Sequence, residues 1–233
     1  MKSKKKIMVI AGSIAAVLLL AVVLFFALGG AELFRDFDAS GYTRAVLDQT
    51  FQGKVEEAAG MIEEQTKEEL YAQYEEGVES FVENNITSGI EMEESLKEKY
   101  IALAKTIFAS MKYEVKEAEK ISRREYQVPV EYKTADIFPN FVASVSEEYA
   151  RLNEKAEKGE YQGAVEEINA QMQTEFLNNC YELLNTKYQE ASYREPETMI
   201  FTVKEDENGL FSLDETQIYE FITKIMGLDE IQD

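Results

Sequence analysis

Residues 126–134 read YQVPVEYKT, and their side chains alternate between types that favour burial and types that favour water. The first set is Tyr126, Val128, Val130, Tyr132 and Thr134. A period of two over nine residues predicts a β-strand with one buried face and one solvated face. Pro129 has no N–H to donate to a sheet ladder, so we expect this strand at a sheet edge or at a bulge.

Three further stretches show strand patterns and indicate a small antiparallel sheet of about four strands. Residues 111–115 alternate in the same way and are followed by a polar turn near 122–124. Residues 198–205 and 210–213 flank Asn208-Gly209, a dipeptide that favours the tight turn of a β-hairpin.

Most of the remaining sequence has apolar residues at helical spacing. Thr66 and Glu69 have the spacing of a capping box, which predicts a helix start. We expect helices over 40–55 with a break at Gly53, 54–62, 66 to about 84, 93–110, 136–158, about 161–188 and 214–226. The two longest would form a helical hairpin inserted between the second and third strands. The predicted fold class is α+β, with an N-terminal transmembrane helix and several amphipathic helices packed against a small antiparallel sheet.

The N-terminus carries four lysines within residues 1–6 and then an uncharged run over 7–28. As a helix, these 22 residues span about 33 Å, enough to cross a hydrocarbon core of roughly 30 Å. We predict a signal-anchor helix at 7–28, with residues 1–6 on the cytoplasmic side. A tether at 29–39 then leads to an acidic extracytoplasmic domain at 40–233, so that the protein sits in the cell membrane by a single pass.

One alternative for the N-terminus stays open. Ala27-Leu28-Gly29 places small residues two apart, which is compatible with a cleaved signal peptide. The chain has one cysteine, Cys180, which lies too far from the apolar run to carry a lipoprotein anchor.

Charge and missing residue types restrict the chemistry. The chain has 24 basic and 45 acidic residues, and from Ala31 onward the balance is 20 against 45, or −25. A domain of this charge repels nucleic acid and anionic lipid headgroups, so we expect the tether to hold it off the bilayer. The chain has no histidine and a single cysteine, which excludes Ser-His-Asp and HExxH sites, an internal disulfide and a cysteine zinc site. We therefore assign no catalytic, metal or cofactor-binding residue and expect no enzyme activity.

Two stretches resemble chemical sites without completing them. Residues 204–215 match an EF-hand loop at several positions, but Lys204 stands where the first carboxylate ligand is required, which favours a plain hairpin turn. Cys180 lies on the apolar stripe of a predicted helix, so we expect a buried structural thiol. A carboxylate-based hydrolase remains an alternative, because spacing cannot select a catalytic pair among 45 acids.

Aromatic side chains on the buried face of the sheet offer a candidate ligand pocket. Its lining would be Tyr113, Tyr126, Val128, Val130, Tyr132 and Phe201. The same side chains would equally fill a core between sheet and helices, and both interpretations stay open.

Three stretches together resemble an uncharacterised domain of membrane-anchored or lipoprotein-type surface proteins of Gram-positive bacteria. They are YTRAVLDQTFQGKVEEA at 42–58, KYEVKEAEKISRREYQVPVEYKTADIF at 112–138 and TVKEDENGLFSLDE at 202–215. The resemblance implies an α+β fold similar to the cystatin-like or nuclear-transport-factor-2-like class, and it implies no established activity.

We therefore expect a membrane-anchored extracytoplasmic binding or interaction domain. Its partner would be a small molecule, a peptide or an envelope protein. The alternatives are a carboxylate-based cell-envelope hydrolase and the ectodomain of a sensor complex, which would need a partner in the membrane because residues 1–6 leave no room for an output domain.

Overall fold

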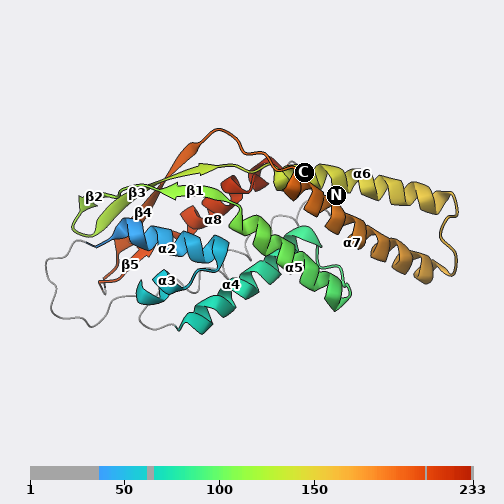
Figure 1. The fold of residues 1–233 in the computed structure, drawn as a ribbon, viewed down its shortest axis with the longest axis horizontal. Coiled ribbons are helices and arrows are strands. Elements are labelled where there is room, and N and C mark those ends of the chain that lie inside the picture. The colour runs from blue at the N-terminus through green and yellow to red at the C-terminus, as the bar shows by residue number, and fades with distance from the viewer. Residues whose placement is uncertain (1–36, 62–65, 208, 232–233) are drawn as a thin grey trace.

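Five strands form one curled antiparallel sheet at one end of the molecule (Figure 1). The structure is a computed structural model, and it describes residues 37–61, 66–207 and 209–231. The strands are β1 (Lys112–Val115), β2 (Glu119–Ser122), β3 (Glu125–Lys133), β4 (Glu197–Glu205) and β5 (Phe211–Leu213). Their order is β1-β3-β4-β5, and β2 also pairs with β3.

The strand predicted from YQVPVEYKT is β3, and its burial alternates residue by residue as expected. The predicted edge position is wrong, because β3 pairs with β1 and β2 on one side and with β4 on the other. The alternative, a bulge, is confirmed. Val115 pairs with Val130 and Glu119 pairs with Gln127, so the three residues 116–118 lie opposite the two residues 128–129.

Pro129 lies at this break in the ladder. Its carbonyl accepts a hydrogen bond from the Lys116 N–H at 2.9 Å, so its ring nitrogen faces the same side, towards the gap between β1 and β2. The missing N–H of proline therefore falls where the ladder is already interrupted, and β3 tolerates it in the middle of the sheet.

Strand β2 has no counterpart in the predicted set. All four of its side chains are exposed, so the alternation that reveals β3 is absent from it. The hairpin of β4 and β5 is confirmed, and Gly209 has the positive φ of 86° that a tight turn requires.

Helices make up the rest of the described chain and mostly match the predicted ranges. They are α2 (Ala39–Gln52), α3 (Glu56–Met61), α4 (Lys67–Phe81), the π-helical turn η1 (Val82–Ile86), α5 (Glu94–Ala109), α6 (Ile137–Glu157), α7 (Val165–Gln189), α8 (Glu215–Ile225) and the 3-10 turn η2 (Leu228–Glu230). The capping box is confirmed: the Thr66 N–H donates to Glu69 Oε2 at 2.8 Å, and the Glu69 N–H donates to Thr66 Oγ1 at 3.2 Å.

The inner face of the sheet is covered by α2 and α8. Phe221 of α8 is fully buried at the centre of this layer. Its ring centroid lies 5.3 Å from that of Phe201, 5.2 Å from that of Tyr132 and 6.1 Å from that of Phe51. These rings join sheet and helices into one hydrophobic core.

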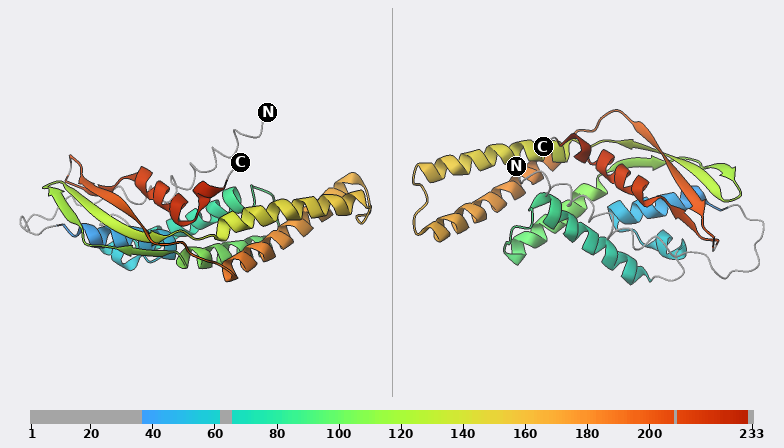
Figure 2. Two further views of the ribbon diagram at one scale, coloured as in Figure 1. Left: turned by 90° about the horizontal axis from the view of Figure 1, so that it is seen from above. Right: turned by 180° about the vertical axis from the view of Figure 1, so that it is seen from behind.

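Helices α6 and α7 form the predicted hairpin, which extends away from the sheet end in every view (Figures 1 and 2). At its base, the Asp136 carboxylate accepts hydrogen bonds from the Ser192 N–H at 2.8 Å and the Ser192 hydroxyl at 2.5 Å. Further out, Leu152 is buried, but Tyr149 and Val165 are 61% and 69% exposed. Helical spacing predicts Tyr149 and Val165 on the apolar faces of these two helices, but both side chains are largely exposed.

The outer half of the hairpin is held by polar contacts around Glu175. Its carboxylate accepts hydrogen bonds from Arg151 at 2.8 Å, from Lys155 at 2.8 Å and from the Tyr161 hydroxyl at 2.9 Å. The Arg151 guanidinium also binds both carboxylate oxygens of Glu148. This network ties α6 to α7 where few apolar side chains meet.

One side chain closes part of the edge of β4. Strand β5 pairs only with residues 203–205. Beyond it, the side-chain oxygen of Gln217 accepts a hydrogen bond from the Thr202 N–H at 2.8 Å, and its amide nitrogen donates to the Ile200 carbonyl at 3.0 Å. A side chain of α8 thus replaces the next strand along this stretch.

The predicted cytoplasmic end (1–6), anchor helix (7–28) and most of the tether (29–39) lie outside the described residues. Over the described ranges, the structure contains no helix with the length and apolarity to cross a membrane. The last tether residues belong to the folded domain, because Phe37 packs on the core and Asp38 caps α2 through the Gly41 N–H.

Candidate functional site

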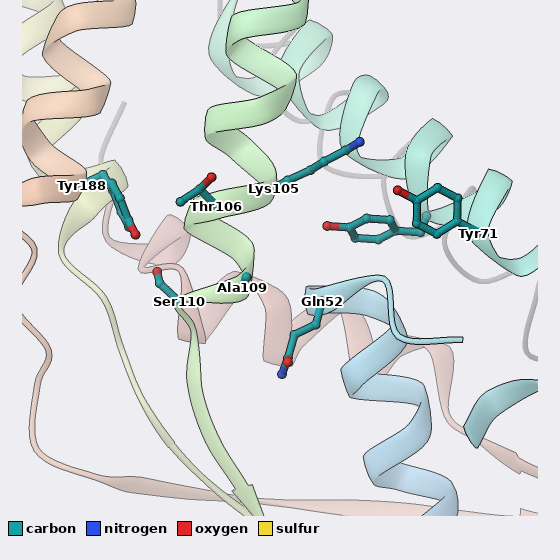
Figure 3. A pocket seen from close by; sticks show the side chains of 8 residues that line it. Gln52, Tyr71, Lys105, Thr106, Ala109, Ser110 and Tyr188 are labelled. Atoms are coloured by element: carbon teal, nitrogen blue, oxygen red, sulfur yellow. The ribbon is translucent and has the colours of Figure 1, made fainter. Parts of the chain in front are cut away.

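A cleft of about 520 Å³ opens between helices α2, α4, α5 and α7 (Figure 3). We call it the tyrosine cleft. Its lining residues are Gln52, Tyr71, Tyr74, Lys105, Thr106, Ala109, Ser110 and Tyr188.

Helix α5 forms the floor of the tyrosine cleft. Thr106, Ala109 and Ser110 follow at helical spacing and share one face, while Leu103 and Ile107 point into the core. The hydroxyls of Thr106 and Ser110 donate to the carbonyls of preceding residues at 2.8 Å and 2.6 Å. The floor is therefore made of small side chains, and its hydroxyl oxygens keep acceptor capacity towards the cleft.

Two tyrosines of α4 form one end of the cleft. The rings of Tyr71 and Tyr74 lie 6.0 Å apart, and Tyr71 is 47% exposed whereas Tyr74 is buried. Gly53, at the end of α2, allows this arrangement. Its φ is +63°, and a Cβ there would lie 2.7 Å from carbon atoms of the Tyr74 ring. Any larger residue would push the Tyr74 ring out of place.

A charge pair spans the cleft between α5 and α4. Lys105 Nζ lies 2.5 Å from both carboxylate oxygens of Glu75. Partial burial pushes the pKa of Glu75 upward, but hydrogen bonds from Lys105 and Tyr71 outweigh this and hold the pKa below its usual value. Glu75 is thus ionised at neutral pH and is compensated by Lys105, so the pair adds no net charge to the cleft.

The tyrosine hydroxyls of α4 stay protonated at neutral pH. The hydrogen bond to Glu75 raises the pKa of Tyr71, and burial raises the pKa of Tyr74 to about 12. These hydroxyls can donate or accept hydrogen bonds, but they do not act as bases near pH 7.

Gln52 is held at the rim by a small polar network. Its amide nitrogen donates to the Tyr113 hydroxyl at 3.1 Å and to Asp48 Oδ1 at 3.3 Å. The Tyr113 hydroxyl in turn donates to Asp48 Oδ1 at 2.6 Å. These contacts fix the position of Gln52 beside the cleft.

The six residues predicted as pocket lining all lie on the inner face of the sheet. Val128, Val130 and Phe201 have no exposed surface, and Tyr126 and Tyr132 are buried. They pack in the core beneath α2 and α8, and the three cavities described in this part of the chain are lined by other residues. Tyr113 does not line the tyrosine cleft, but its hydroxyl accepts a hydrogen bond from Gln52, which does.

The sequence pattern places Tyr74 on the apolar face of the helix that starts after Thr66, but it does not indicate that this or any other lining residue borders a cleft. Tyr71 and Tyr188 fall outside the apolar faces of their predicted helices. An aromatic ring on an otherwise polar helix face is the sequence feature that could have indicated their role. Lys105 was indistinguishable from other surface lysines, because its partner Glu75 lies 30 residues away.

The other chemical candidates have structural surroundings. Cys180 is buried, and burial raises the pKa of its thiol to about 12, which makes it a poor nucleophile. In the 204–215 segment, Asp206 Oδ1 accepts a hydrogen bond from the Leu210 N–H at 2.9 Å, as in a hairpin turn. Within the described ranges, no group of three or more acidic or cysteine side chains is arranged to hold a metal ion.

Two further cavities lie elsewhere. One of about 430 Å³ adjoins η1, where Lys97 pairs with Glu79 and, at 2.8 Å, with Glu83. The other, of about 530 Å³, lies on the hairpin beside Glu148 and Arg151 and is as open to solvent as the tyrosine cleft. Neither combines aromatic rings with uncharged polar groups as the tyrosine cleft does.

Comparison with known proteins identifies one similar fold. No protein-family model matches the chain, and no curated protein matches its sequence. Among solved structures, the chain is similar to YcdA of Bacillus subtilis, described as a "putative lipoprotein", with a TM-score of 0.51 and 12% identity. The match covers 81% of this chain but 56% of the Bacillus protein, so the chain spans little more than half of its length. At this identity the match shows a shared fold.

Proposed function

We propose that the chain is a membrane-anchored extracytoplasmic binding domain without catalytic activity, and that the tyrosine cleft holds its ligand. The observation that carries this is the lining of the cleft, in which tyrosine rings and uncharged polar groups surround a compensated Lys105–Glu75 pair. Such a site favours an uncharged ligand with hydroxyl or amide groups, since ring faces cover apolar surface while hydroxyls fix orientation. Its volume lies in the usual range for ligand sites.

The pKa shifts of the carboxyl groups favour binding over hydrolysis. A general acid of a glycoside hydrolase needs a raised pKa. The described carboxyls with a clear shift are Glu69, Glu75, Glu148 and Glu175, and all four are shifted downward. The anchor is supported by the uncharged run at 7–28.

The test is ligand binding by the full chain in nonionic detergent, read by saturation-transfer NMR. The probes are chitotetraose, maltotetraose and the peptide acetyl-Ala-Gln-Ala-amide, all uncharged. We expect at least one to bind, and Tyr71→Ala to weaken that binding about tenfold, which corresponds to one lost ring contact. Tyr149→Ala removes an equally accessible tyrosine from the hairpin and should change nothing. No binding by any probe, or equal effects of the two substitutions, would show that the site is wrong.

A further inference from the structure

The chain enters the described domain at the sheet end, beside the turn between β2 and β3. The ring of Phe37 stacks on that of Phe211 at 4.1 Å and lies 6.0 Å from the ring of Tyr126. Lys120 of β2 places its ammonium 5.6 Å from the centroid of the same Tyr126 ring. The start of the domain and β2 are thus neighbours.

Hydrogen bonds hold this entry point in place. The Ser40 hydroxyl donates to the Lys116 carbonyl at 3.1 Å, and it accepts from the Ala118 N–H at 2.8 Å. The first turn of α2 is therefore attached to the link between β1 and β2. The α6–α7 hairpin projects from the opposite end of the molecule (Figure 1).

Chain length limits how far this end can lie from the apolar run. Eight residues, 29–36, lie between Leu28, the last of the run, and Phe37, so nine Cα–Cα steps join the two. At most about 3.5 Å per residue, they span no more than about 31 Å. If the run lies in a membrane, as the proposed function requires, the β2–β3 end is held close to the lipid surface.

The segment of β2 and the β2–β3 turn differs in charge from the rest of the chain, and also from the adjacent β4–β5 turn, which carries Glu205, Asp206 and Glu207. Residues 116–125 contain four basic and three acidic side chains, a balance of +1, whereas the whole chain carries −21. Arg123 and Arg124 are exposed at the turn, and Arg124 Nε also pairs with Glu205 of β4 at 3.2 Å. The side chain of Ile121, next to Lys120 in β2, is 47% exposed. Cations beside an exposed aliphatic side chain suit the interface of a membrane with anionic headgroups.

We propose that β2 and the β2–β3 turn, residues 119–124, contact anionic headgroups of the membrane that holds the apolar run, and that this contact directs the α6–α7 hairpin away from the lipid. The acidic remainder of the domain is repelled by the same surface, which favours the same orientation. This inference rests on the membrane anchor of the proposed function. It identifies the hairpin and the tyrosine cleft as the parts left accessible to ligands.

The test compares two variants of the full chain, each with a single fluorophore. One variant is labelled at the β2–β3 end of the domain and the other at the tip of the α6–α7 hairpin. Ser122→Cys and Glu160→Cys provide exposed thiols, while the buried Cys180 stays unlabelled. The chain is reconstituted in vesicles of equal parts phosphatidylglycerol and phosphatidylcholine that contain a headgroup-linked energy acceptor. We expect stronger energy transfer from position 122 than from position 160.

Charge reversal tests the contact itself. Arg123→Glu with Arg124→Glu should reduce transfer from position 122 in phosphatidylglycerol vesicles and leave it unchanged in pure phosphatidylcholine. Lys158→Glu with Lys187→Glu, an equal charge change on the hairpin, should have no such effect. Added salt should likewise reduce energy transfer from position 122 in the chain with unchanged arginines, because it screens their attraction to the anionic headgroups.

The outcomes separate the two proposals. Flotation of the vesicles in a density gradient measures whether the chain is bound to them. If the chain does not float with the vesicles, the proposed membrane anchor is wrong. If it floats but transfer from position 160 equals or exceeds that from position 122, or the arginine reversal changes nothing, the anchor stands and the proposed contact is overturned.

Discussion

Phe221 is the side chain on which the packing between α8 and the sheet depends most. It has no exposed surface, and its ring contacts those of Phe51, Tyr113, Tyr132 and Phe201 at centroid distances from 5.2 to 6.3 Å. Phe221→Ala removes the ring and leaves a cavity, because the four elements packed around this side chain cannot all move inward to fill it.

The expected cost follows from these contacts. Replacement of a buried phenylalanine by alanine costs about 3–5 kcal/mol of unfolding free energy. Aromatic pairs add about 0.5–1.5 kcal/mol each beyond simple area burial, and this ring makes four of them. We therefore expect a loss near the upper end, about 5 kcal/mol, a large fraction of the stability of an ordinary domain.

The assay is urea unfolding of the full chain in nonionic detergent, followed by far-ultraviolet circular dichroism. Tyr149→Ala is the control, since an exposed ring on the hairpin should contribute within about 0.5 kcal/mol. A loss below about 2 kcal/mol for Phe221→Ala, with an unchanged denaturant slope, would refute the view that this ring joins helix to sheet. The new cavity should bind benzene and recover part of the stability, because empty cavities with apolar walls accept apolar guests.

Two further predictions concern a glycine and a carboxylate. Gly227→Ala should cost about 1–3 kcal/mol in thermal unfolding, because its φ is +67° and a Cβ would lie 2.9 Å from the Ala135 carbonyl oxygen. Gly159→Ala, with φ +71° and open space around it, should cost only about 1 kcal/mol. Hydrogen bonds from Arg151 and Lys155 lower the pKa of Glu175 from 4.5 to about 2, so its contribution to stability is present above pH 4.5 and lost as pH falls towards 2. The melting temperatures of wild type and Glu175→Gln should accordingly converge over that interval, and a constant difference would contradict this.

Local patterns in the sequence predicted most of the elements of this fold. The alternation in 126–134 identified β3, and the Thr66–Glu69 spacing identified the start of α4. Each of these signals is contained within a short stretch of the chain, of at most nine residues. The position of β3 inside the sheet was not predictable in this way, because whether Pro129 meets a paired or an interrupted ladder depends on β1 and β2.

The tyrosine cleft shows the same limit more strongly. It joins four helices, and its charge pair connects residues 30 positions apart. No period or motif links Tyr71 to Tyr188, whereas the buried rings of β3 were easy to find and were considered as a pocket for that reason. The predicted helical hairpin was correct in outline, but hydrophobic periodicity did not reveal that Tyr149 and Val165 have nothing to pack against.

The hydrogen bonds of Gln217 to the backbone of β4 restrict how other polypeptide chains can bind to this protein. Many extracellular domains capture an extended peptide by β-augmentation, in which the guest becomes an extra strand. Along residues 200–202 of β4 that route is closed, since the backbone groups a guest would use are already bonded to the Gln217 amide. The same bonds stop two copies from merging into a continuous intermolecular sheet there, a hazard for proteins crowded on a surface. Recognition along residues 200–202 must therefore go through side chains and leave this part of the β4 backbone untouched.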